Sequence, residues 1–152
     1  MTQSSPKILA ISSGGGHWVQ LLRLRPACEG ANVYLATVKE GNRSDVGGSE
    51  FRVIADGNLS NKWALVKSAC SIIRLLLTER PDTVISTGAA PGYFAIRFGK
   101  LLGMRTVWVD SIANADELSM SGKKAGGCAD LWLTQWSHLA TENGPKHYGS
   151  VL

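Results

Sequence analysis

Short apolar segments alternate with longer amphipathic segments along this chain of 152 residues, and the alternation constrains the fold more than any other feature. A strand that is followed by a helix and then by another strand favours a parallel sheet with right-handed crossovers. We therefore predict an α/β fold, a Rossmann-like parallel sheet flanked by helices, in a single domain spanning residues 1–152. The patterns predict strands at residues 7–12, 33–37, 51–54, 83–86, 105–109 and 130–134, and helices at 17–25, 61–80, 93–102 and 137–143.

The longest predicted helix, at residues 61–80, is followed by Pro81 and carries an apolar stripe at helical spacing. The segment 38–50 is rich in Gly, Asn and Asp and is predicted to be a loop. We expect the stripe of the long helix to pack on the sheet. It consists of Leu65, Ala69, Ile72, Ile73, Leu76 and Leu77.

The net charge of +4 favours an anionic ligand or an anionic membrane surface. Nucleic acid is not an expected partner, because the longest run of cations is the pair Lys123–Lys124 and no zinc-finger or RNA-recognition motif occurs. The three cysteines lie far apart without a CxxC motif, so neither a disulfide framework, a metal site nor another cofactor is predicted. No segment has the apolar length expected of a membrane span or a signal peptide.

Glycines and small polar residues gather at the ends of three predicted strands, where ligands bind in a parallel sheet. The first such loop, residues 12–18, has the sequence SSGGGHW. Ser13 and the glycines Gly14, Gly15 and Gly16 allow a tight turn that presents backbone N–H groups at a helix N-terminus. This geometry favours a phosphate or a diphosphate, and the alternative is a tight turn that binds no ligand.

His17 stands in the first turn of the helix that follows this loop, at the mouth of the sheet. A neutral imidazole accepts a proton from an attacking hydroxyl, so His17 is a candidate general base, although a lone histidine is often structural. Trp18 is a candidate for stacking on a sugar ring or for lining a lipid-facing cleft, with core packing as the equal alternative.

The second loop, residues 86–93 (STGAAPGY), repeats the pattern of a strand end, small residues and a helix start. Because its strand and the first strand are expected to be neighbours, the two loops form either a second anion cradle or one shared site. The candidates for contact with the anion are Thr87, Gly88, Ala89 and Gly92, and Tyr93 is a candidate for contact with the rest of the ligand.

The third loop, residues 110–114 (DSIAN), directly follows the strand at 105–109. Asp110 at the strand tip can orient a hydroxyl or a histidine, and its alternative role is to cap the next turn. Asn114 in the same loop is a further candidate for contact with the ligand.

A dinucleotide site is the competing interpretation of the first loop, and the sequence disfavours it. The GxGxxG pattern would put its third glycine at Val19, and no acidic residue closes the second strand, which ends in Ala36–Thr37. A GxxxxGK[ST] phosphate loop does not occur in the sequence either. A nucleotide-binding oxidoreductase is therefore the least favoured function.

The order of these motifs resembles the asparagine-linked-glycosylation protein 14 family, which includes accessory subunits of bacterial exopolysaccharide and capsule glycosyltransferases. The resemblance covers nearly the whole chain and is carried by SGGGHW, PDTVISTGAAPGY, GKLLGMRTVWVDSIAN and ADLWLTQW, in that order. The chain is similar, more distantly, to the acceptor domain of the peptidoglycan GlcNAc transferase. The fold that this family implies is the N-terminal half of a GT-B glycosyltransferase, with a separate protein supplying the nucleotide-sugar half.

The resemblance implies a subunit of an inverting glycosyltransferase that is active only with its partner. Such an enzyme transfers a sugar from a UDP-sugar to a polyprenyl-diphosphate-linked saccharide, and it needs no metal. The glycine loops at 14–16 and 88–92 are expected to face the acceptor diphosphate, and His17 falls where the related enzyme has its candidate base. Asp110 stands where many members of the family carry Glu, which is one methylene longer.

The resemblance also implies that the glycosyltransferase acts at the cytoplasmic face of a membrane. Eukaryotic members begin with a membrane-spanning helix that is not evident here, so peripheral attachment is expected. The helix at 61–80, with Trp63 and the cations Lys62, Lys67 and Arg74, is a candidate surface for it. The main alternative function is a non-catalytic recruiter that brings a partner transferase to the membrane and stabilises it.

Overall fold

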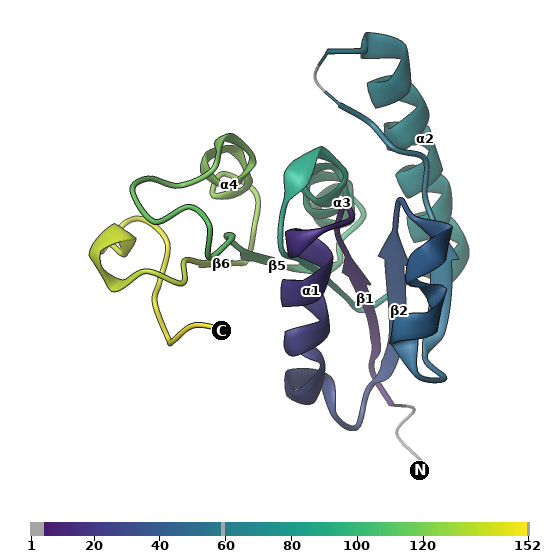
Figure 1. Ribbon diagram of the computed structural model, residues 1–152, viewed down its shortest axis with the longest axis horizontal. Helices are drawn as coiled ribbons and strands as arrows, with labels where there is room; N and C mark the ends of the chain where they lie inside the picture. Colours follow the sequence, from purple (N-terminus) through teal and green to yellow (C-terminus); the bar gives the residue numbers. More distant parts are fainter. Residues whose placement is uncertain (1–4, 59, 152) are drawn as a thin grey trace.

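The computed structural model describes residues 5–58 and 60–151, and six parallel strands form its centre (Figure 1). The strand order is β3-β2-β1-β4-β5-β6, and every neighbouring pair is parallel. The predicted parallel sheet is confirmed, and its strand ends differ from the prediction by one residue at most. The strands are β1 (Lys7–Ile11), β2 (Asn32–Thr37), β3 (Glu50–Val53), β4 (Thr83–Ser86), β5 (Arg105–Val109) and β6 (Leu131–Leu133).

The chain reverses its direction across the sheet between β1 and β4. From β1 it moves outward to β2 and β3, and it then returns to β4, which pairs with the other side of β1. In an open parallel sheet, the loops on the two sides of such a switch point leave a crevice at the carboxyl ends of the strands. The two glycine-rich loops follow β1 and β4, so the fold brings them to this crevice.

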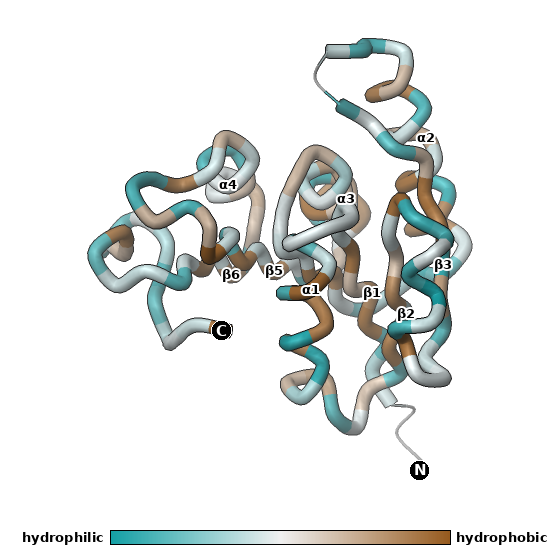
Figure 2. The backbone as a smooth tube through the Cα atoms, viewed as in Figure 1, coloured by the Kyte–Doolittle hydropathy of each residue, from teal (hydrophilic) through white to brown (hydrophobic). Residues whose placement is uncertain are grey.

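Helices cover both faces of the sheet, and hydrophobic residues run along β1 between them (Figure 2). Side chains of α2, α3 and α4 pack on one face around Ile72, Ile96 and Trp108, and those of α1 and η2 pack on the other around Leu35 and Phe51. Among the helices of the described ranges, none combines the length and the apolarity needed to cross a bilayer. The α-helices are α1 (Gly16–Arg23), α2 (Lys62–Glu79), α3 (Ala89–Leu101) and α4 (Met120–Ala125), and the 3-10 segments are η1 (Arg25–Cys28), η2 (Glu40–Val46) and η3 (Ser137–Leu139).

Two predictions about the extent of these segments are wrong. The segment 38–50, predicted as a loop, contains η2, which forms because Val46 is buried in the cluster around Leu35. The predicted helix at 137–143 is reduced to the single 3-10 segment η3. In η2 tertiary packing, and not the local pattern, decides where the segment is ordered, whereas no residue of η3 is buried.

The helices near the carboxyl ends of β4 and β5 also depart from the prediction. α3 begins at Ala89, four residues before its predicted start, with Gly88 as its N-cap and Pro91 inside its first turn. α4 is absent from the prediction. The hydroxyl of Ser119 caps α4 by accepting a hydrogen bond from the backbone N–H of Gly122 at 2.8 Å.

α2 buries a narrower stripe than the sequence predicts. Ser68, Ile72 and Leu76 are its buried residues, and the Asn61 side chain caps it by accepting a hydrogen bond from Ala64 N at 3.1 Å. At about 3.6 residues per turn, the side chain that follows Leu76 turns well away from it. Leu77 is accordingly 52% exposed, and its assignment to the packing stripe is wrong.

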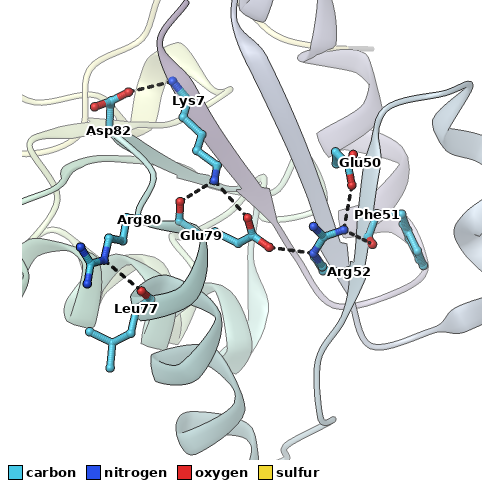
Figure 3. Close-up of polar contacts among 8 residues, drawn as sticks. All are labelled: Lys7, Glu50, Phe51, Arg52, Leu77, Glu79, Arg80 and Asp82. Carbon is cyan, nitrogen blue, oxygen red and sulfur yellow. Dashed lines mark hydrogen bonds and ion pairs between the residues drawn. The ribbon is translucent and has the colours of Figure 1, made fainter. Parts of the chain in front are cut away.

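The C-terminal end of α2 is fastened to the sheet by an ion-pair network (Figure 3). The Glu79 carboxylate accepts hydrogen bonds from Lys7 Nζ at 3.0 Å and from Arg52 Nε at 2.8 Å, which joins α2 to β1 and β3. The Lys7 ammonium also lies 4.2 Å from the centroid of the Tyr34 ring. Burial raises the pKa of Glu79, but the hydrogen bonds and charges of Lys7 and Arg52 outweigh it, so the pKa lies below its ordinary value of 4.5.

Candidate functional site

A cleft of about 320 Å³ opens at the carboxyl end of the sheet, beside the switch point between β1 and β4. Two larger hollows, of about 650 and 730 Å³, share Thr83 and Arg105 at the amino ends of β4 and β5. Ligands of parallel α/β sheets bind at the carboxyl ends, so the smaller cleft is the candidate site. It is lined by Gly16, His17, Gln20, Ala89, Ser111, Ala113, Asn114, Ser119, Met120 and Ser121.

Gly15 and Gly16 open this site at the start of α1. Gly15 caps the helix with a φ of 69°, a conformation that glycine adopts at no steric cost. A Cβ atom built on either glycine would meet no atom within 4 Å, so packing does not explain them. The N-terminus of α1, where N–H groups and the helix dipole stabilise anions, is therefore approachable at this point.

Gly14 differs from its neighbours, because the aliphatic stem of Lys39 lies against it. A Cβ atom at this position would come within 2.8 Å of Lys39 Cδ, so packing explains Gly14 without a ligand. The same contact places the Lys39 ammonium near the first glycine loop, and in the described part of the chain Lys39 forms no ion pair. No sequence pattern reveals this cation, since only the fold carries Lys39 over the loop.

His17 joins the two glycine-rich loops. Its Nδ1 lies 3.0 Å from the carbonyl oxygen of Thr87, and the Thr87 hydroxyl donates a hydrogen bond to the His17 carbonyl oxygen at 2.7 Å. A carbonyl oxygen only accepts, so Nδ1 carries the proton, and Nε2 of the neutral ring keeps its lone pair. Because His17 also lines the cleft, it has the tautomer and the place that a general base requires.

The second glycine loop is packed more tightly than the sequence predicts. The His17 ring lies against Gly88, which has a φ of 145°, and the side chains of Ser86 and Trp108 fill the space beside Gly92. The backbone N–H of Gly88 donates to Ser86 Oγ at 3.3 Å. Internal packing thus explains why both positions are glycines, and contact of Gly88 and Gly92 with a diphosphate stays a prediction.

Ala89 is the residue of the second loop that reaches the cleft. It lines the cleft with a φ of 63°, which is uncommon for a residue other than glycine. Thr87 is buried, and its hydroxyl is taken by the bond to His17. Ser13 is half-buried beside the first loop, where its hydroxyl donates a long bond of 3.5 Å to the carbonyl oxygen of Gly14. The two loops therefore build one shared site, with α1 contributing its open side.

Two aromatic residues predicted to contact a ligand pack in or against the hydrophobic core. Trp18 is 3% exposed, meets Phe51 edge to face, and donates from Nε1 to Asp45 at 2.9 Å. Tyr93 is half-buried against the hydrophobic cluster on the other face, with 6.0 Å between its ring centroid and that of Phe94. Burial rules out Trp18 as a residue that stacks on a ligand, whereas contact of the half-buried Tyr93 with a ligand stays a prediction.

Asp110 accepts hydrogen bonds from residues that line the cleft. The residue is 1% exposed, and its carboxylate accepts hydrogen bonds from Trp108 Nε1, from Asn114 Nδ2 and from both the backbone N–H and the hydroxyl of Ser119. The absence of a side chain at Gly122 leaves room for this carboxylate. Asn114 and Ser119 both line the cleft, so Asp110 is placed to position them and not to touch a ligand itself.

A second buried network ties the loop after β5 to α1. Gln20 Nε2 donates to Ser111 Oγ at 3.1 Å, and Gln20 Oε1 accepts from the backbone N–H of Ile112 and from Gln135 Nε2. Gln135 Oε1 in turn accepts from the backbone N–H of Val151 at 2.9 Å. Sequence patterns do not reveal these residues, because the bonded partners lie as far as 115 positions apart.

The cleft offers groups that bind hydroxyls and anions. Its lining provides the imidazole of His17, the amide of Asn114 and several serine hydroxyls. Within the described ranges, no three His, Cys, Asp or Glu side chains gather in a way that suits a metal ion. The arrangement suits recognition of a saccharide and removal of a proton from one of its hydroxyls.

About two thirds of the chain match a known family. The family model described as "Oligosaccharide biosynthesis protein Alg14 like" matches residues 49–152. The chain belongs to the Alg14-like family. The matched part contains the second glycine loop and Asp110, whereas the first glycine loop lies before it.

Two Alg14 proteins from yeasts are similar to the chain over much of its length. The chain is 23% identical, over 178 aligned residues, to the UDP-N-acetylglucosamine transferase subunit ALG14 of Yarrowia lipolytica. This alignment covers 98% of this chain and 82% of the relative. It is 27% identical, over 109 aligned residues, to the subunit of the same name from Debaryomyces hansenii. This second alignment covers 66% of this chain and 47% of the relative.

Solved structures share the fold of this Alg14-like chain. MurG from Acinetobacter baumannii has a TM-score of 0.76 at 14% identity, over 97% of this chain and 46% of MurG. UDP-N-acetylglucosamine 2-epimerase from Rickettsia bellii has a TM-score of 0.72 at 14% identity, over 97% of this chain and 45% of the epimerase. The chain thus spans less than half the length of either structure. The TM-scores confirm the predicted Rossmann-like fold of an N-terminal GT-B domain.

Proposed function

We propose that this chain is the acceptor-binding subunit of a two-component inverting glycosyltransferase. The observation that carries the proposal is the pair of hydrogen bonds between His17 and Thr87. These bonds hold the His17 imidazole beside the open N-terminus of α1, at the switch point of the sheet. Membership of the Alg14-like family supports the same function, because both yeast relatives are named as subunits of a UDP-N-acetylglucosamine transferase.

The acceptor in this proposal is a polyprenyl-diphosphate-linked saccharide. Its diphosphate binds at Gly15 and Gly16, where the first N–H groups of α1 and the helix dipole stabilise negative charge. The ammonium of Lys39 adds a positive charge close to the same loop, and Ala89 bounds the site on the α3 side. The saccharide lies toward Asn114, which also lines the cleft.

His17 is the catalytic base in this scheme. The acceptor hydroxyl gives its proton to Nε2 while its oxygen attacks the anomeric carbon of the UDP-sugar, and the bond from that carbon to UDP breaks. UDP leaves with the electron pair, and the configuration at the anomeric carbon inverts. The Thr87 carbonyl, which accepts from Nδ1, stabilises the imidazolium that forms. Asp110 contributes as a positioning residue through Asn114 and Ser119.

A separate subunit binds the UDP-sugar, and the active site is complete only when the two subunits meet over the cleft. The names of the two relatives support N-acetylglucosamine as the sugar transferred. The complex acts at the cytoplasmic face of a membrane in polysaccharide biosynthesis. This chain attaches there peripherally and recruits the donor-binding subunit.

Reconstituted transfer tests the proposal. The chain is combined with a candidate donor-binding subunit from the same genome, with labelled UDP-N-acetylglucosamine and with membranes that carry a lipid-linked acceptor. We expect product only when both subunits are present, and we expect His17→Ala to slow transfer about 100-fold or more while the complex still forms. Val19→Ala, at an exposed position of the same helix, is the matched control and keeps its activity.

The non-catalytic recruiter makes the opposite prediction for the same variant. If the chain only stabilises its partner at the membrane, His17→Ala leaves turnover unchanged while the two subunits still co-purify. Full transferase activity from this chain alone would contradict the two-subunit proposal itself.

A further inference from the structure

We infer that the outer face of α2 is a docking surface for an anionic phospholipid bilayer. The inference rests on the proposed function, which places the acceptor in a membrane, and it names the part of the chain that meets that membrane. The surface consists of the apolar residues Trp63, Val66, Cys70 and Leu77 and the flanking cations Lys62, Lys67 and Arg74.

α2 carries two apolar stripes on different sides. The inner stripe, with Ile72 and Leu76, is buried against the sheet and α3. Trp63, Val66 and Leu77 are 83%, 53% and 52% exposed, and their spacing puts them together on the side turned away from the inner stripe. A surface helix normally has a polar outer side, so this outer stripe is not explained by packing within the described part of the chain.

Cations border the outer stripe, and no acidic residue interrupts it. Lys62, Lys67 and Arg74 lie along α2, whose one acidic residue, Glu79, stands at its C-terminal end in the ion-pair network of Figure 3. In the ranges that the structure describes, none of these three cations forms an ion pair. Because each Lys or Arg near an anionic lipid surface adds attraction, the charge complements acidic headgroups.

The composition of the outer face favours a bilayer over a protein groove. An exposed Trp63 between lysines is typical of interfacial helices, in which the indole ring sits at headgroup level and lysine stems extend toward the phosphates. The stripe from Trp63 to Leu77 is about 21 Å long at the rise of an α-helix. A helix with one exposed apolar side lies in the plane of a lipid surface with that side toward the acyl chains.

The position of α2 brings this surface to the edge at which the cleft opens. In Figure 1, the N-terminal half of α2 projects beyond the carboxyl ends of the strands, the edge at which α1 and α3 begin. A bilayer that contacts the Trp63 end of α2 therefore holds a lipid-borne acceptor on the same side of the molecule as Gly16 and His17.

Vesicle co-sedimentation with the full chain tests this surface, using phosphatidylcholine vesicles with and without phosphatidylglycerol. We expect binding to the anionic vesicles only, weakened by salt, and about tenfold weaker binding for Val66→Glu and for Trp63→Ala. Val19→Glu is the matched control, because Val19 is 48% exposed on α1, which packs on the opposite face of the sheet. This variant is expected to bind as the native chain does.

Circular dichroism and thermal unfolding establish that each variant folds. If Val66→Glu does not fold, Trp63→Ala carries the test, because its side chain lies almost wholly outside the core. Failure of the native chain to bind anionic vesicles overturns the inference, and so does an equal loss for Val19→Glu. A native dimer that Val66→Glu dissociates also overturns it, since a second copy would then cover the face.

Transfer to a short-chain acceptor in detergent separates this inference from the proposed function. We expect Val66→Glu to keep transfer in detergent and to lose it on membranes. Transfer in detergent without any vesicle binding by the native chain overturns the docking surface alone. Vesicle binding without transfer under either condition overturns the proposed function alone.

Discussion

The contact between the His17 ring and Gly88 is the most demanding requirement that the site places on a single residue. Gly88 has a φ of 145° and a ψ of −179°, a region of backbone conformation that is essentially restricted to glycine. A Cβ atom there would overlap the imidazole, whose Nδ1 bonds the carbonyl oxygen of the preceding residue, Thr87. The orientation of the proposed base therefore depends on this glycine.

Gly88→Ala is expected to lower the free energy of unfolding by about 2–4 kcal/mol, through backbone strain and displacement of the His17 ring. Urea unfolding measures this loss. Gly41→Ala is the control, because Gly41 has no positive φ and open space around it, and its effect is expected to stay within about 0.5 kcal/mol. Equal stability of the two variants would show that the His17–Gly88 contact is not a constraint.

Asp110→Asn tests the positioning role of the buried carboxylate. The amide has the same size, but it turns an acceptor into a donor that faces the donors of Trp108 or Ser119. We expect a loss of about 2–4 kcal/mol in the free energy of unfolding. We also expect faster amide hydrogen exchange across residues 111–119, and unchanged exchange in that loop would contradict the positioning role.

At the scale of the elements, the network that joins α2 to β1 and β3 makes stability depend on pH. The pKa of Glu79 lies below its ordinary value of 4.5 in the folded chain. A carboxylate with a lowered folded pKa contributes stability above its unfolded pKa, and this contribution is lost as the pH falls through the folded pKa. The network therefore stabilises the fold at neutral pH and weakens in acid.

Glu79→Gln is expected to be less stable than the native chain at neutral pH and to lose less stability below pH 4.5. Urea unfolding between about pH 7 and about pH 3 measures both effects. Glu117→Gln is the control, since Glu117 pairs with Lys123 at the exposed surface, where an ion pair contributes little. Parallel pH profiles for the native chain and Glu79→Gln would show that the network does not contribute.

The elements that sequence predicts well are those whose pattern is local. Most strands are short apolar runs and α2 has a clear helical period, so the sheet and its longest helix follow from the sequence. α4 does not, because Gly122 within it lowers helix propensity, and the helix is held by the Ser119 cap and by contacts with α3. η2 escapes prediction for the same reason, as burial of Val46 orders a segment rich in turn formers.

The residues of the candidate site also differ in whether the sequence alone identifies them. Gly15, Gly16 and His17 can be identified from the sequence, because a glycine-rich turn between a strand and a helix is a local signal. Lys39 and Gln20 cannot, because their contacts in the site are made by the fold. An aromatic residue beside a glycine loop is equally suited to a core and to a ligand, which is why burial had to decide the role of Trp18.

At the scale of the whole molecule, the carboxyl and amino edges of the sheet carry different kinds of residues. The carboxyl edge carries the switch point, the start of α1, the cleft and the projecting half of α2. The amino edge carries the hydrogen bond from Lys7 N to Asp82 and the ion pairs of Glu79, which fasten elements together (Figure 3). Under the proposed function, a donor-binding subunit approaches from the carboxyl edge, where the acceptor is proposed to bind.

Calorimetric titration of the isolated chain tests most directly whether it holds the acceptor diphosphate and not the nucleotide sugar. We predict that a short, water-soluble prenyl diphosphate binds, and that Gly16→Asp weakens this binding about tenfold or more by repulsion at the start of α1. Leu101→Asp, at an exposed position at the C-terminal end of α3 that does not line the cleft, is expected to bind as the native chain does. UDP-N-acetylglucosamine is expected to give no saturable heat. Saturable binding of UDP-N-acetylglucosamine to the isolated chain, with no binding of the prenyl diphosphate, would contradict the account.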